Sequence, residues 1–205
     1  MPPAKEYLEE REVRKMYGRL FGKWFCTSLI AIGALCWFLL PAFAGTDADN
    51  LIKNGDFSGP VVNGLPSAWN PWTSDVSGVS VNKDADGSFV SIKKEMNTTW
   101  YLRQRINTKD LHGKALVFSA KVKVEGINDF RYEYSGGRLT IVTSGKVVKE
   151  IALKEDCNWK KVTLTPWVVP DDVDFIYALI GFHTTKGKFS FRDVSLVPVA
   201  QNTAK

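Results

Sequence analysis

The stretch Asn50-Leu51-Ile52-Lys53-Asn54-Gly55-Asp56-Phe57-Ser58-Gly59 marks the point where the composition of this chain changes. A long apolar segment precedes it, and short apolar runs separated by turns follow it. Leu51 and Phe57 are the apolar residues of an expected short strand. Asn54-Gly55-Asp56 is turn chemistry, because Asn and Gly tolerate positive φ at low cost. The stretch therefore predicts the start of an all-β domain.

After this stretch, apolar and polar side chains alternate with the period of two that is typical of β-strands. The segment from Thr98 to Ile106 places Trp100, Leu102, Gln104 and Ile106 on one face and Tyr101, Arg103 and Arg105 on the other. The segment from Ala115 to Val124 alternates in the same way. About ten such strands, separated by turns, predict one two-sheet β-sandwich over residues 45–199, followed by a polar tail at residues 200–205.

Residues 1–44 predict export. The segment from Phe25 to Ala44 is almost entirely apolar, Arg19 and Lys23 precede it, and Ala42-Phe43-Ala44 supplies the small residues of a cleavage site. This order is typical of a secretory signal peptide, and Met16 fits as its true start because several glutamates precede that residue. The alternative is an uncleaved membrane anchor, since about 20 apolar residues can span a bilayer. We expect a periplasmic or extracellular protein, bound to a membrane only if the apolar segment is retained.

Charge and cysteine content argue against two kinds of protein. The net charge is +5, but residues 45–205 carry 21 basic and 18 acidic side chains in mixed order. This balance does not predict a nucleic-acid partner. Cys26 and Cys36 lie in the apolar segment, so Cys157 is the one cysteine of the domain. A disulfide-stapled scaffold is therefore not expected, and the sequence does not indicate an oligomeric state.

The two ends of the domain resemble a known class of module. Asn50–Gly59 and Phe189-Ser190-Phe191-Arg192-Asp193-Val194-Ser195-Leu196 are similar to the first and last strands of carbohydrate-binding modules of families four, nine and twenty-two. Between them, WYLRQRI (100–106), HGKALVFSAKVKV (112–124) and NWKKVTLTPWVVP (158–170) match the same pattern. The resemblance covers residues 50–199. It implies a galactose-binding-like jelly-roll β-sandwich that binds carbohydrate, with Trp159 as a structural core residue.

Many members of these families hold a structural calcium ion with acidic residues near both ends of the domain. At two of those positions this chain has Ser58 and Arg192 instead. The resemblance therefore leaves Asp56 and Asp193, with backbone carbonyls, as the candidate calcium ligands. Ca²⁺ usually takes six to eight oxygens, several of them anionic. No other cofactor is implied.

Sugar recognition needs flat aromatic rings for the C–H faces of a pyranose and planar polar groups for its hydroxyls. Several such side chains lie opposite the apolar faces of their own expected strands. We predict a ligand-binding face formed by Trp167, Tyr101, Arg103 and Arg105, with Tyr132 and Tyr134 at its edge. The arginines would donate to sugar hydroxyls or pair with a uronic acid. The alternatives are a Trp167 covered by a loop and an ordinary solvent-facing edge strand at Tyr132 and Tyr134.

No catalytic signature accompanies this face. The chain has no G-x-S-x-G, H-E-x-x-H or C-x-x-C motif. Asp171, Asp172 and Asp174 form a loop cluster rather than the facing carboxylate pair of a glycosidase. The expected function is an exported, non-catalytic module that binds a polysaccharide or cell-envelope glycan by aromatic stacking. Two alternatives stay open: an assembly or adhesion domain without sugar affinity, and a polysaccharide-active hydrolase or lyase.

Overall fold

The computed structural model describes residues 50–199 except Asp129 and Arg131. The predicted signal peptide or anchor, the start at Met16 and the tail at residues 200–205 lie outside the described residues. All described residues belong to the second of the two units of the chain, Phe43–Lys205. Among them, no helix has the length and apolar composition that crossing a membrane requires.

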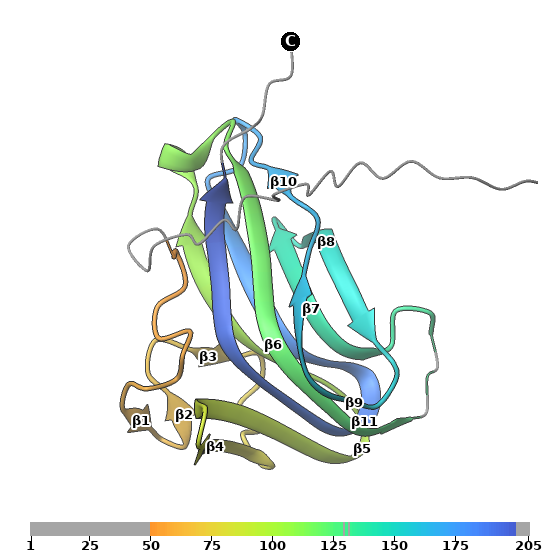
Figure 1. Ribbon diagram of the computed structural model, residues 1–205. Helices are drawn as coiled ribbons and strands as arrows, with labels where there is room; N and C mark the ends of the chain where they lie inside the picture. The colour runs from red at the N-terminus through yellow and green to blue at the C-terminus, as the bar shows by residue number, and fades with distance from the viewer. Residues whose placement is uncertain (1–49, 129, 131, 200–205) are drawn as a thin grey trace, which may run out of the picture. The chain divides into compact units, whose positions relative to one another are not determined.

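Antiparallel strands make up most of the described chain (Figure 1). They are β1 (Val61–Val62), β2 (Leu65–Pro66), β3 (Asn70–Pro71), β4 (Val79–Asp84), β5 (Gly87–Asn107), β6 (Ala115–Asn128), β7 (Gly136–Thr143), β8 (Lys146–Leu153), β9 (Cys157–Thr163), β10 (Trp167–Val168) and β11 (Phe175–Val199). A single turn of 3-10 helix, Lys109–Leu111, follows β5. The all-β prediction is confirmed for the part of the chain that the structure describes.

The two longest strands, β5 and β11, pair with each other and pass through both layers of a β-sandwich. One layer, the β7 sheet, has the order β3, residues 98–107 of β5, residues 175–185 of β11, β7, β8. The other layer, the β6 sheet, has the order β4, residues 87–94 of β5, residues 187–199 of β11, β6, with β9 and β10 both on the far edge of β6. Register shifts between Phe182 and Gly187 mark where β11 changes layer.

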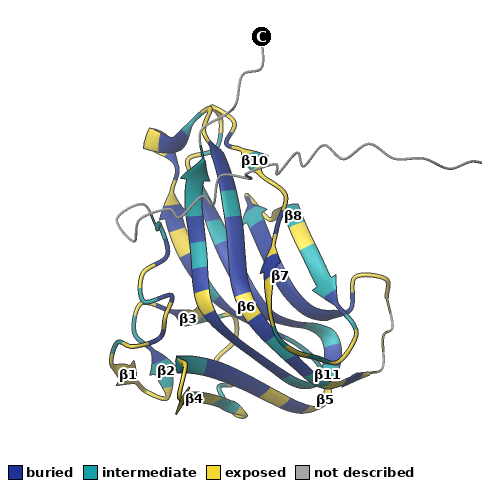
Figure 2. Cartoon of the chain, viewed as in Figure 1, coloured by how far each residue is buried: buried dark blue, intermediate teal, exposed yellow. Residues whose placement is uncertain are grey.

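The core lies between these layers, and it is built from the alternating apolar positions of the strands (Figure 2). Trp100, Leu102 and Ile106 of β5 belong to it, as predicted from their alternation. The other strands contribute Phe118, Val122, Leu139, Ile141, Ile176, Ile180, Phe182, Phe189 and Phe191, all of them almost fully buried. Polar side chains on the same strands therefore lie on the outer faces of the two sheets.

The stretch 50–59 forms turns rather than the predicted short strand. It nevertheless ties the two ends of the domain together: Leu51 N donates to Leu196 O at 2.9 Å, and Val194 N donates to Gly55 O at 2.8 Å. The backbones approach so closely at Gly55 that a Cβ there would lie 2.0 Å from Val194 O. Phe57 is buried against Trp69 and Phe191. Packing against Val194 therefore requires glycine at position 55.

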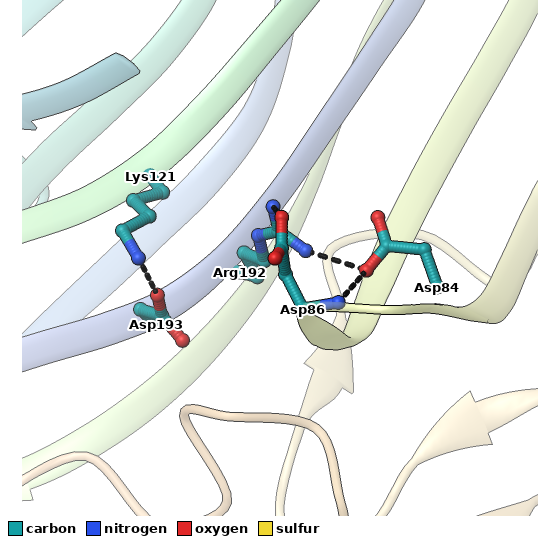
Figure 3. A network of polar contacts seen from close by, with 5 residues as sticks. All are labelled: Asp84, Asp86, Lys121, Arg192 and Asp193. Atoms are coloured by element: carbon teal, nitrogen blue, oxygen red, sulfur yellow. Dashed lines mark hydrogen bonds and ion pairs between the residues drawn. The ribbon is translucent and has the colours of Figure 1, made fainter. Parts of the chain in front are cut away.

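A buried arginine fastens the hairpin between β4 and β5 to the outer face of the β6 sheet (Figure 3). Arg192 is 3% exposed, and its guanidinium contacts Asp84 at 2.8 Å and Asp86 at 2.9 Å. Trp159 covers it, with its ring 4.2 Å from Cζ. Trp159 is half-buried and also contacts Phe89, so its predicted place in the core is wrong. Alternation along β9 from Val162, which faces the core, places Trp159 on the outer face; its expected place in the core came from the family resemblance and not from the alternation.

We expect Arg192→Ala to lower the free energy of unfolding by about 2–3 kcal/mol, because hydrogen bonds to charged groups are lost at a buried site. Asp86→Asn removes one charge from the same cluster, but Asp86 is 75% exposed, so less than about 1 kcal/mol should be lost. Urea unfolding measures both. If both variants lose the same free energy of unfolding, the structural role of Arg192 is contradicted.

Candidate functional site

The outer face of the β7 sheet gathers aromatic and arginine side chains. Because directly opposed residues of antiparallel strands share a face, Tyr101 of β5, Gly181 of β11 and Arg138 of β7 form one row across the sheet. Arg103, Leu179 and Thr140 form the next row. We call this surface the aromatic face and define it by Trp72, Tyr101, Arg103, Arg105, Tyr132, Tyr134, Arg138, Phe175, Tyr177 and His183.

A line of rings crosses the aromatic face. Trp72 lies next to β3 and meets the edge of Tyr101 at 6.3 Å between ring centroids; Tyr101 is 6.2 Å from His183, and His183 is 5.1 Å from Tyr134. Tyr132 stacks on Tyr134 at 5.1 Å. The ends of this line are exposed, Trp72 by 46%, whereas Tyr101 is 5% exposed. Two exposed ring platforms therefore lie on either side of the buried Tyr101, which is opposite Gly181 in the strand register.

Tyr101 and His183 are linked at this centre. The Tyr101 hydroxyl is 2.9 Å from Nδ1 of His183. Burial raises the pKa of Tyr101 to about 12, against the opposing effect of Arg138. Burial, with the charge of Arg138, lowers the pKa of His183 below its ordinary value. At neutral pH Tyr101 is therefore protonated and His183 neutral, an arrangement in which the hydroxyl can donate to Nδ1.

Arg103 and Arg105 lie against rings. The Cζ atom of Arg103 is 5.1 Å from the Trp72 ring and 5.3 Å from the Tyr177 ring, and that of Arg105 is 4.2 Å from the Phe175 ring. Because neither guanidinium forms a side-chain hydrogen bond or ion pair within the described residues, its N–H groups are available as donors. Such rings and planar donors are the two kinds of group that bind sugars.

Strand β7 holds two buried polar atoms without partners within the described chain. Arg138 of β7 is 4% exposed and forms an ion pair with Glu150 of β8. Its Nε atom and Oγ1 of Thr140 are buried and have no hydrogen-bond partner within the described chain. Buried polar groups are nearly always paired in native proteins. Nε of Arg192 on the other sheet is buried in the same way, so these atoms do not by themselves distinguish the two sheets.

Tyr132 and Tyr134 are carried by a turn, not by the predicted edge strand. Ser135 N donates to Tyr132 O at 3.0 Å, and Tyr132 N donates to Oγ of Ser135 at 3.1 Å. The Ser135 hydroxyl also lies 2.9 Å from Oγ1 of Thr184 in β11. The turn is thus fastened to the sheet, which holds its two rings at the end of the aromatic face.

The structure brings together five of the six predicted ligand-binding residues. Trp167 is the exception, because it pairs with Leu116 of β6 and packs against the core from the β6 sheet. The predicted common face was wrong for Trp167: residues 164–166 leave the strand before it, so alternation counted through them gives the wrong side. Trp72, Arg138, Tyr177 and His183 were missed. Alternation from Ile176 to Phe182 on the core side assigns Tyr177 and His183 to the other face.

The two candidate calcium ligands are engaged with protein groups. Asp193 forms an ion pair with Lys121 at 2.9 Å (Figure 3), and Asp56 accepts a hydrogen bond from Ser58 N at 3.2 Å. Within residues 50–199 as described, no group of three His, Cys, Asp or Glu side chains is placed to hold a metal ion. The residues present therefore do not fit a carboxylate-rich calcium site, and a calcium held there by backbone carbonyls stays a prediction.

A hollow of about 470 Å³ on the outer face of the β6 sheet is a second candidate surface. Its lining includes Val117, Ser119, Lys121, Lys161, Asp193 and Val197, and no aromatic side chain contributes. Since aromatic platforms are central to sugar binding by protein surfaces, the aromatic face fits a carbohydrate better than this hollow does.

The fold has known counterparts. No protein-family model and no curated protein matches the sequence. Among solved structures, a module described as "CBM4 structure and function" is 21% identical with a TM-score of 0.54, covering 72% of this chain and 99% of that one. A family 61 carbohydrate-binding module in complex with β-1,4-galactotriose is 16% identical with a TM-score of 0.51, and the match covers 73% of this chain and 99% of that one. A family 16 carbohydrate-binding module is 16% identical with a TM-score of 0.50, and the match covers 72% of this chain and 99% of that one. The described domain thus has the jelly-roll fold of carbohydrate-binding modules.

The lowered pKa of His183 predicts a pH dependence of stability. As pH falls through about 6.5, His183 of the unfolded chain takes up a proton while folded His183 stays neutral, so the folded state loses stability. Between pH 7.5 and 5.5 the melting temperature should fall more steeply in the wild type than in His183→Gln. Identical slopes, or an NMR-measured pKa of His183 at or above 6.5, would argue against this burial effect.

Proposed function

We propose that this protein binds carbohydrate on the aromatic face of the β7 sheet. The observation that carries the proposal is the pair of exposed platforms, Trp72 at one end and Tyr132 stacked on Tyr134 at the other. Between them lie the donors Arg103 and His183. Sugar rings would stack on the platforms while these donors bind hydroxyls. A jelly-roll fold shared with carbohydrate-binding modules supports the same function.

We propose a binding function without catalysis. The strand segments that form the β7 sheet contribute one carboxylate to the described structure, Glu150, and it is tied to Arg138. Glycosidases use two facing carboxylates. The line of rings from Trp72 to Tyr132 is longer than one sugar ring, which favours a polysaccharide over a single sugar.

The proposal includes export, which rests on the sequence pattern between Met16 and Ala44. N-terminal sequencing of the protein recovered outside the cytoplasm tests it, and Gly45 or Thr46 is the expected first residue. Recovery of a membrane-bound form that still carries Phe25 would instead make this an anchored protein.

Trp72→Ala and Tyr134→Ala should each weaken binding by about 1–3 kcal/mol, the range for a contact aromatic. Their melting temperatures should change little, because both side chains are exposed. Trp159→Ala is the matched control: it removes an aromatic ring from the β6 sheet and should leave the affinity unchanged. Affinity electrophoresis of the full chain in xylan, β-1,4-galactan, β-glucan, pectin and alginate measures the effect.

Two outcomes would contradict the proposal. If no polysaccharide retards the wild-type chain, an assembly or adhesion domain is the better account. If a bound polysaccharide is cleaved, the protein is an enzyme and the assignment of a binding function alone fails.

A further inference from the structure

We propose that the ligand of the aromatic face is an acidic polysaccharide, bound through the carboxylates of its uronic acid residues by Arg103 and Arg105. This inference rests on the proposed function and adds the chemical class of the ligand. It starts from the charges of the face. The outward side chains of its strands include three arginines, Arg103, Arg105 and Arg138, against one carboxylate, Glu150, so the face has an excess of positive charge.

Only one of the three arginines on this face, Arg138, has a carboxylate partner among the described residues. Glu150 is already paired with Arg138. Neither Arg103 nor Arg105 forms an ion pair or a side-chain hydrogen bond within the described residues; their contacts are with the rings of Trp72, Tyr177 and Phe175. Other buried or half-buried cations of the domain do have carboxylate partners, such as Lys94 with Asp75 and Arg192 with Asp84. The two arginines of β5 are therefore positioned by rings and left without counter-charge.

The geometry suits a carboxylate. The N–H groups of a guanidinium form paired hydrogen bonds with the two oxygens of a carboxylate, and those of Arg103 and Arg105 are not engaged by side chains of the described residues. Arg103 lies beside the exposed Trp72, so one sugar ring could stack on Trp72 while the carboxylate on its C5 reaches Arg103. Arg105 lies two residues along β5 on the same face, which gives a second such contact for the same polymer. A neutral sugar would leave both charges without a partner.

The experiment compares polymers that differ only in their carboxylates. The full chain should bind polygalacturonate or alginate at least about ten-fold more tightly than the same polymer after carboxyl reduction. Arg103→Gln with Arg105→Gln should abolish this preference. Lys160→Gln with Lys161→Gln removes the same net charge from exposed positions of β9 and should preserve it. Arg103→Lys keeps the charge and loses the planar fork, so it should lower the preference as well.

The outcomes separate this inference from the proposed function. Equal binding of native and reduced polymers, weakened by Trp72→Ala, would overturn the acidic ligand and leave carbohydrate binding intact. No binding to any polysaccharide would overturn both. Binding of dextran sulfate that equals that of the uronates and falls equally in both double variants would show attraction to polyanions by net charge alone, and would also overturn the inference.

Discussion

The pairing of β5 with β11 is the constraint on which the rest of the structure depends. Both strands run through the two layers, and their shared register brings Tyr101 opposite Gly181 and Arg103 opposite Leu179. Because side chains alternate between faces, burying Trp100, Leu102 and Phe182 in the core obliges Tyr101, Arg103 and His183 to lie outside. A shift of one residue would bury the arginines. The hydrophobic core thus determines which side chains form the aromatic face.

The same principle explains what could be predicted from the sequence. Regular alternation in the segment from Thr98 to Ile106 predicted the face of Tyr101, Arg103 and Arg105, because β11 pairs with β5 without a register shift from Trp100 to Asn107. Trp159 was expected in the core from the family resemblance, although alternation from Val162 places it outside. Trp167 was assigned to the wrong side because residues 164–166 leave the strand before β10. Local pattern cannot reveal such interruptions, which depend on the partner strand. Trp72 was missed for a related reason: β3 is too short to show any period.

The arginines on the outer faces of the two sheets have different kinds of partner. On the β6 sheet, the charges that are described near Arg192 are matched with carboxylates of the β4–β5 hairpin, and Trp159 covers them. On the β7 sheet, Arg103 and Arg105 contact rings only. A buried Nε atom without a partner occurs on both sheets, in Arg138 and in Arg192, and does not distinguish them. The two arginines of β5 have no carboxylate partner within the described chain, and this difference supports a ligand site on the β7 sheet.

The central claim is that one outer face of one sheet binds the ligand. NMR spectra of the ¹⁵N-labelled chain, titrated with oligogalacturonate, test it most directly. The account predicts shifts in the amide signals of Trp72, Tyr101, Arg103, Tyr134 and His183, together with the indole N–H of Trp72, while amides of β6 and β9 stay unchanged. Shifts confined to residues around Lys121, Lys161 and Asp193 would place the ligand on the opposite sheet and contradict the account.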